Sequence, residues 1–108
     1  MALYMTQFAY TADAWKALTR SPEDRREAIG ALAQRLGGRL VSLYYAFGEY
    51  DGVVISDMPD DVSAAALAIA AAAPGHLKAM RTTRLLTVEE TLEALRRAGA
   101  AGFQGPAG

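Results

Sequence analysis

Residues 38–59, GRLVSLYYAFGEYDGVVISDMP, decide the fold of this 108-residue chain. Two runs rich in β-branched and aromatic residues flank the tetrapeptide 48–51, Gly-Glu-Tyr-Asp. This pattern predicts two antiparallel strands joined by a turn. Gly48 can supply the positive φ that the first position of a tight turn requires. The turn can span two, three or four residues, so the sequence leaves open which side chains of each strand face the helices.

Neither strand of this hairpin has a polar face. One alternate set of the first strand includes Leu40 and Tyr44, and the other includes Leu43 and Phe47. Because side chains point alternately to the two faces of a strand, apolar groups in both sets predict that both faces are covered. A chain of this length covers one face with its own helices. The other face therefore predicts a homodimer paired sheet to sheet; the alternative is a half-exposed sheet whose tyrosine hydroxyls stay in water.

Helix start and stop signals divide the rest of the chain. Ser21 and Asp60 have the side chains and the positions of helix N-caps. The helix after Asp60 has no polar face beyond Ser63, which is typical of a helix that is enclosed or packs closely on a neighbour. The expected elements are a strand over residues 2–10, a helical turn over 11–15, a helix from Ser21-Pro22-Glu23-Asp24 to Gly37-Gly38, the hairpin, a helix from Pro59-Asp60-Asp61 to Pro74-Gly75, a strand over 76–86 and a last helix opened by the capping-box pattern of residues 87–90.

The order of these elements is strand, helix, strand, strand, helix, strand, with one further helix. Right-handed crossovers place that order in the α+β class, as a ferredoxin-like βαββαβ fold with an antiparallel four-stranded sheet plus a C-terminal helix. Both main helices then lie on one face of the sheet. We expect a single domain over residues 1–98 and a flexible tail over residues 99–108.

Composition excludes several classes of function. With 11 basic and 12 acidic residues the net charge is -1, which favours neither nucleic acid nor an anionic membrane. The chain has no cysteine for a disulfide or a thiolate metal site, and its single histidine cannot form a multi-histidine site. The start of the chain lacks the pattern of a signal peptide, and no apolar run is long enough to span a bilayer. We therefore expect a cytoplasmic protein with no nucleic-acid or membrane partner, no metal and no cofactor.

The hairpin also carries a family resemblance. The motif Gly48-Glu49-Tyr50-Asp51, with LYYAF before it and VVI and Pro59-Asp60-Asp61 after it, resembles the GYD-domain family. The resemblance extends to Tyr10-Thr11-Ala12 and Trp15 near the start, and to residues 84–87 near the end. It implies a dimeric α+β barrel, in which ferredoxin-like subunits pair sheet to sheet, often in larger homo-oligomers. It implies no single activity, since the wider superfamily includes cofactor-independent monooxygenases and isomerase-like enzymes.

Two residues are candidates for proton transfer. His76 is either an ordinary surface or turn-capping residue or a general base. Glu49 is a candidate acid/base group if a substrate comes within reach. The competing interpretation of the turn is structural: Gly48 forms it, Tyr50 packs across the hairpin, and Asp51 accepts hydrogen bonds from N–H groups of the turn.

Aromatic residues are the candidates for ligand binding. Trp15 and Tyr44 are the two we favour for a cleft between sheet and helices that takes a planar apolar ligand, and Trp15 lies where a lid would. Packing in the core or in an interface is the alternative. Arg81 and Arg84 fall on opposite faces of the last strand, so one of them is expected to point to the uncovered face, where an ion pair is the ordinary outcome.

Two classes of function remain. The first is a homo-oligomer that binds a small apolar or aromatic molecule, or acts as a scaffold, without catalysis; it follows from surplus apolar surface and few catalytic groups. The second is a cofactor-independent enzyme of the monooxygenase or isomerase type, with His76, Glu49 or a tyrosine moving protons; it rests on the resemblance and on the tyrosine-rich sheet.

Overall fold

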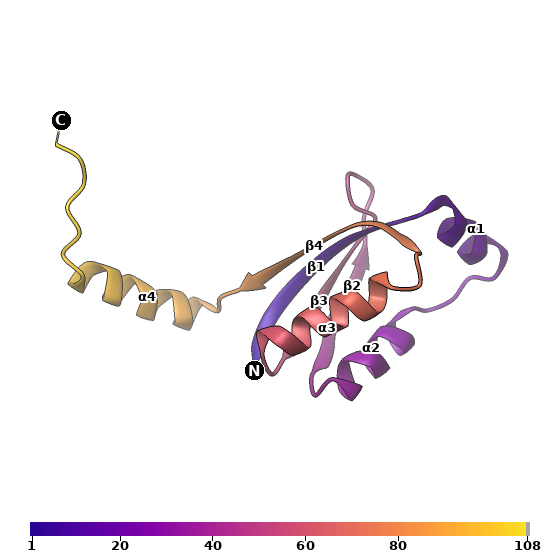
Figure 1. Cartoon of the computed structure of the whole chain (residues 1–108), viewed down its shortest axis with the longest axis horizontal. Helices are drawn as coiled ribbons and strands as arrows, with labels where there is room; N and C mark the ends of the chain where they lie inside the picture. Colours follow the sequence, from indigo (N-terminus) through magenta and orange to yellow (C-terminus); the bar gives the residue numbers. More distant parts are fainter. Residues whose placement is uncertain (108) are drawn as a thin grey trace.

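The structure, a computed structural model, describes residues 1–107 (Figure 1). Its four strands form one antiparallel sheet in the order β2-β3-β1-β4. This is the ferredoxin-like arrangement that the sequence predicts. The elements are β1 (Ala2–Tyr10), α1 (Ala12–Arg20), α2 (Arg26–Arg35), β2 (Arg39–Tyr45), β3 (Gly52–Met58), α3 (Asp61–Ala72), β4 (Leu77–Leu85) and α4 (Val88–Ala100).

The hairpin forms as predicted, but its connection is longer than two to four residues. Residues 46–51 separate β2 from β3. The pairing of the two strands shifts between Leu40 and Ser42, and this irregularity changes the alternation of β2. Leu40 and Leu43 consequently lie on the same face, where both pack beside the buried Val54. Neither alternate set expected from the sequence is therefore preserved along the whole strand.

One face of the sheet carries the core. Helices α1, α2 and α3 pack against strands of the sheet, and Figure 1 shows α2 and α3 side by side over it. One buried cluster contains Tyr4, Met58 and Leu67; a second contains Phe8 and Val54. Alternate residues of the central strands supply both clusters, so the remaining alternate residues must point to the opposite face.

No helix within residues 1–107 covers that opposite side, which we name the open face. The two central strands place aliphatic side chains there, and the edge strands add Tyr44, which is 64% exposed, together with polar and charged groups. Arg81 lies on the open face because it pairs with Gln7, whereas Arg84 pairs with Tyr4 on the helix side. The aliphatic group on the open face consists of Leu3, Met5, Val53 and Ile55.

The segment around Ser21 differs from the prediction. The side chain of Thr11 accepts a hydrogen bond from Ala14 N at 3.2 Å and starts a helix of nine residues rather than a single turn. Ser21 ends that helix, since its N–H donates to the carbonyl of Ala17 at 3.0 Å. The next helix begins only at Arg26. A serine followed by a proline is typical of a helix start, but here α1 continues to Arg20 and Ser21 is its C-cap.

The other predicted helix ends are confirmed. Asp60 caps α3 by accepting from Ser63 N at 2.7 Å. Gly37, with φ of 86°, follows the end of α2, and Thr87 and Glu90 form both hydrogen bonds of a capping box at the start of α4.

The last helix projects away from the sheet and the other helices (Figure 1). It continues to Ala100, so the predicted boundary at residue 98 falls inside it. The predicted tail has no regular secondary structure over residues 102–107, and Gly108 lies outside the described residues. None of the helices in residues 1–107 combines the length and the hydropathy that crossing a bilayer requires.

Candidate ligand-binding cleft

A cleft of about 460 Å³ lies between the helix side of the sheet and helices α1, α2 and α3. Strand residues Phe8, Val54 and Met80 line its floor. Ile29 of α2 and Leu67 of α3 are among the side chains on its walls. Its volume falls within the range of roughly 300–1,000 Å³ that is typical of small-molecule sites.

Small residues create this space. Helix α3 presents Ala68 and Ala71 to the cleft, where longer side chains would fill the gap between α3 and α2. In the sheet, Gly52 pairs with the lining residue Phe8, and a Cβ atom at this glycine would overlap the Phe8 ring. The glycine therefore leaves room for the Phe8 ring, and the alanines border the volume above the sheet.

The lining residue Tyr10 is hydrogen-bonded to a second tyrosine outside the lining. The hydroxyl of Tyr10, which lines the cleft, is 3.2 Å from that of Tyr45. Burial raises the pKa of Tyr10 well above its usual range, and the hydrogen bond with Tyr45 raises it further. The nearby charge of Arg25 opposes this shift only in part. The Tyr10 hydroxyl is thus a neutral donor or acceptor near pH 7, not a phenolate base.

The charged lining is mainly basic. Glu23 forms an ion pair with Arg25, and the hydrogen bond between them raises the pKa of the Arg25 guanidinium. Arg35, from the end of α2, and His76, from the α3–β4 connection, line the cleft as well. Glu23 is the only acidic residue in the lining formed by the described chain.

The two candidates for proton transfer are separated in space. His76 borders the cleft, is exposed, and accepts at its backbone carbonyl from Thr11 N at 2.9 Å. Glu49 is exposed in the 46–51 connection and is not part of the lining. A shared acid/base pair of these two residues does not form, and the catalytic role of either one stays a prediction.

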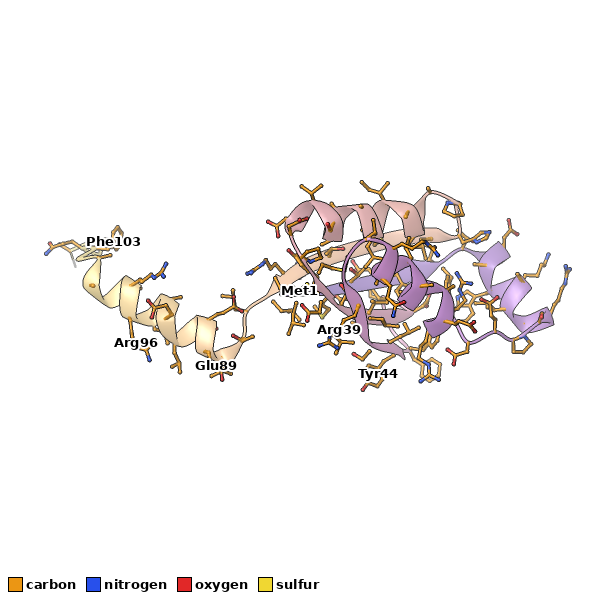
Figure 2. All side chains as sticks on the ribbon, turned by 90° about the horizontal axis from the view of Figure 1, so that it is seen from below. Met1, Arg39, Tyr44, Glu89, Arg96 and Phe103 are labelled. Carbon is orange, nitrogen blue, oxygen red and sulfur yellow. The ribbon has the colours of Figure 1, made fainter. Side chains whose placement is uncertain are left out.

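The two aromatic candidates are also apart. Trp15 packs edge-on against Tyr10, with ring centroids 5.0 Å apart, and so lies behind a lining residue without lining the cleft itself. Tyr44 is on the open face; Figure 2 shows it at the side of the body away from α3. Ligand binding at Trp15 or Tyr44 remains a prediction. Sequence reasoning missed Arg35, Ala68 and Ala71, whose placement depends on how α2 and α3 pack.

The Gly-Glu-Tyr-Asp motif has a structural role that differs from the predicted one. Among residues 1–107, only Gly37, Gly75 and Gly102 have positive φ, so the interpretation of Gly48 was wrong. The carboxylate of Asp51 accepts from Tyr10 N at 2.8 Å, a residue of β1 and not of the turn. The backbone N–H of Asp51 donates to the carbonyl of Phe8 at 2.8 Å. Asp51 thereby fastens the hairpin connection to the end of β1, where the cleft lies.

A shallower groove lies between α3 and β4. The hydroxyl of Tyr4 donates to Asp61 there, and this hydrogen bond is the main cause of the raised pKa of Tyr4. Arg84 lines the same groove and lies 3.7 Å from Glu90 at the base of α4. Within residues 1–107, no group of three or more His, Asp or Glu side chains is placed to hold a metal ion.

The fold and the cleft define an α+β protein with a ferredoxin-like sheet, one helical layer and a mainly apolar site between them. The family model described as the GYD domain matches residues 4–95, and the chain belongs to that family. Two solved structures share the fold. TTHA0845 from Thermus thermophilus is 13% identical with a TM-score of 0.53, and the match covers 82% of this chain and 96% of that one.

MtbAldR is 12% identical with a TM-score of 0.56. The match covers 80% of this chain and 52% of MtbAldR, so this chain spans about half of that protein. At these identities the likeness concerns the fold alone. No curated protein matches the sequence.

Proposed function

We propose that this protein is a homo-oligomer that binds a small apolar or aromatic molecule in the cleft between the sheet and helices α1, α2 and α3. The observation that carries the proposal is the cleft itself, about 460 Å³ and lined mainly by apolar side chains. Small-molecule sites are typically clefts of roughly 300–1,000 Å³ lined mostly by apolar side chains with a few polar groups. An apolar cleft of this size, bordered by alanines on α3 and by a few charged side chains, matches that description.

Fluorescence of N-phenyl-1-naphthylamine, a neutral apolar probe, tests this proposal. Ala71→Phe would fill the cleft from α3, whereas Ala73→Phe introduces the same side chain at a position outside the lining. We expect saturable binding by the wild type and by Ala73→Phe, with a loss of about tenfold or more, or 1.4 kcal/mol, in Ala71→Phe. Absence of binding by the wild type, or equal binding by both variants, contradicts the proposal.

The open face supports the assembly part of the proposal. Its aliphatic side chains lie on the two central strands, while Arg39 and Arg81 lie on the edge strands. Arg39 pairs with Asp57 at 3.4 Å. An apolar centre surrounded by charged groups is the usual anatomy of a protein interface. A second copy placed sheet to sheet would cover the apolar centre on both subunits at once.

Helix α4 supplies a second apolar surface for the same partner. Val88, Leu92 and Leu95 form one stripe along it and are 71%, 46% and 62% exposed. A single helix of this length is marginal in water without packing. A stripe of this kind on a well-capped helix that projects from the fold supports contact with another copy of the chain.

Light scattering coupled to size-exclusion chromatography tests the assembly. Ile55→Glu places a charge in the centre of the open face, and Ile69→Glu makes the same change at a 67% exposed site on α3, on the helix side of the sheet. At about 10 µM, a concentration at which standard-size interfaces commonly hold, we expect a dimer or larger species for the wild type and for Ile69→Glu. We expect a smaller species for Ile55→Glu. A monomeric wild type, or an unchanged mass for Ile55→Glu, refutes sheet pairing.

An enzyme of the cofactor-independent type is the second candidate. The specific observation in its favour is that His76, a side chain suited to acid/base chemistry, borders the cleft. Mass spectrometry of a bound compound, after incubation in air with the wild type and with His76→Gln, tests this candidate. Conversion by the wild type alone supports it, and recovery of unchanged compound from both proteins rejects it.

A further inference from the structure

We infer that the ligand of the cleft is an apolar carboxylic acid and that Arg35 binds its carboxylate. The inference rests on the proposed binding function and concerns the charge of the ligand. Its starting point is the imbalance in the lining: the single carboxylate, Glu23, is already paired with Arg25, and the guanidinium of Arg35 has no carboxylate partner within residues 1–107.

Arg35 differs in this respect from most arginines of the chain. The other cleft-lining arginine, Arg25, is in an ion pair. So are five arginines elsewhere in the chain: Arg26, Arg39, Arg84, Arg96 and Arg97. Arg20 and Arg81 also lack a carboxylate partner in the described chain, but neither lines the cleft. Arg35 therefore combines two properties that no other arginine there combines: it borders an apolar cavity, and its charge is not neutralised by the protein.

The position of Arg35 on α2 suits an amphipathic anion. Ala28, Leu32 and Arg35 are spaced at i, i+4 and i+7, so they lie along one side of the helix, and all three line the cleft. An apolar body can lie along the first two residues while the guanidinium at the end of the row meets a carboxylate. The planar guanidinium can bind such a group through two hydrogen bonds at once.

The opposite end of the cleft fits the same orientation. Tyr10 and His76 lie beside α1, and the Tyr10 hydroxyl is neutral near pH 7, with burial raising its pKa further above its usual range. A cationic ligand has no free carboxylate to meet anywhere in the described lining. A ligand with an apolar body and one acidic end is thus the class that leaves the fewest charges unpaired.

Competition between two matched compounds tests the inference. Decanoate and decanol share an alkyl chain and differ in the carboxylate, and each is used to displace N-phenyl-1-naphthylamine from the full chain. Because an exposed charge pair is screened by solvent, we expect decanoate to displace the probe at concentrations about three- to tenfold lower than decanol at low salt. Arg35→Gln should reduce this ratio to about one, and Arg35→Lys should retain part of it; the ratio is taken within each variant, so a change in probe affinity does not affect it.

Arg26→Gln is the matched control, since Arg26 lies on the same helix, pairs with Asp24 and does not line the cleft. Equal displacement by decanoate and decanol in the wild type overturns the inference, as does a preference that survives Arg35→Gln. If His76→Gln abolishes the preference for decanoate and Arg35→Gln does not, the carboxylate binds near His76, and the assignment to Arg35 is overturned. Probe binding without any preference for the acid rejects this inference alone, whereas no probe binding at all rejects the proposed function with it.

Discussion

Asp51→Ala is the substitution that tests most directly how the hairpin is joined to the rest of the fold. The Asp51 carboxylate accepts from Tyr10 N at 2.8 Å, and Tyr10 is 9% exposed. Alanine removes the acceptor and leaves a buried backbone N–H without a partner. Such a loss costs about 1–3 kcal/mol. The two hydrogen bonds made by the backbone of Asp51, to Phe8 and from Ala46, remain available because the main chain is unchanged.

Asp51→Asn and Glu49→Ala complete the test. Asparagine keeps an acceptor oxygen at nearly the same place, so we expect Asp51→Asn to lose less stability than the alanine variant. Glu49 is exposed in the same connection and makes no side-chain hydrogen bond or ion pair within residues 1–107. We therefore expect Glu49→Ala to remain within about 0.5 kcal/mol of the wild type.

Urea unfolding monitored by the fluorescence of Trp15, the only tryptophan, measures these differences. All variants are compared at one protein concentration, because association changes apparent stability. A loss of 1–3 kcal/mol corresponds to a decrease in Tm of roughly 4–20 °C for a domain of about 100 residues. If Asp51→Ala is as stable as the wild type, or if Glu49→Ala loses as much, the structural role assigned to Asp51 is wrong.

Two further predictions concern local structure. Gly52→Ala would press a methyl group against the ring of Phe8 and should cost about 1–3 kcal/mol, whereas Gly48→Ala, with open space around it, should stay within about 0.5 kcal/mol by the same urea assay. Hydrogen bonds from Ser63 in the first turn of α3 lower the pKa of Asp60 in the folded protein. The ionised carboxylate therefore stabilises the fold at pH values above the pKa that Asp60 has in the unfolded chain. This stabilisation is lost as the pH falls through the pKa of Asp60 in the folded protein. Thermal unfolding between about pH 5 and pH 2 should therefore show a smaller decrease in Tm for Asp60→Asn than for the wild type.

The parts of the fold that could be predicted are those with local signals. A cap is decided by a few neighbouring residues, so Asp60 and the capping box of Thr87 were identified correctly. Ser21 shows the limit of the same reasoning. Its side chain suits the start of a helix, but nothing in its neighbours states whether the preceding helix has already ended, and the structure uses it as the end of α1.

A cleft between sheet and helices was predicted, but its lining residues were not, because they depend on distances between elements. The apolar helix α3 was interpreted as enclosed or as packed closely on a neighbour, yet Ala68 and Ala71 border an open volume, and Val62 and Ile69 are exposed. The shift in pairing between Leu40 and Ser42 places Leu40 and Leu43 on the core side together, an arrangement that the alternation of the strand does not predict. Arg35 was missed for the same reason, since only the approach of α2 and α3 makes it a lining residue.

The two proposed surfaces lie on opposite faces of one sheet, and this makes them separable. The lining residues of the cleft lie on the helix side of the sheet, whereas Ile55 points to the open face. Ile55→Glu should therefore abolish sheet pairing while the affinity for N-phenyl-1-naphthylamine changes by less than about threefold, equal to about 0.7 kcal/mol. Fluorescence titration of the size-fractionated variant measures this. Loss of probe binding together with loss of assembly would mean that the cleft is completed or held open by the second copy, and that binding and assembly form one function.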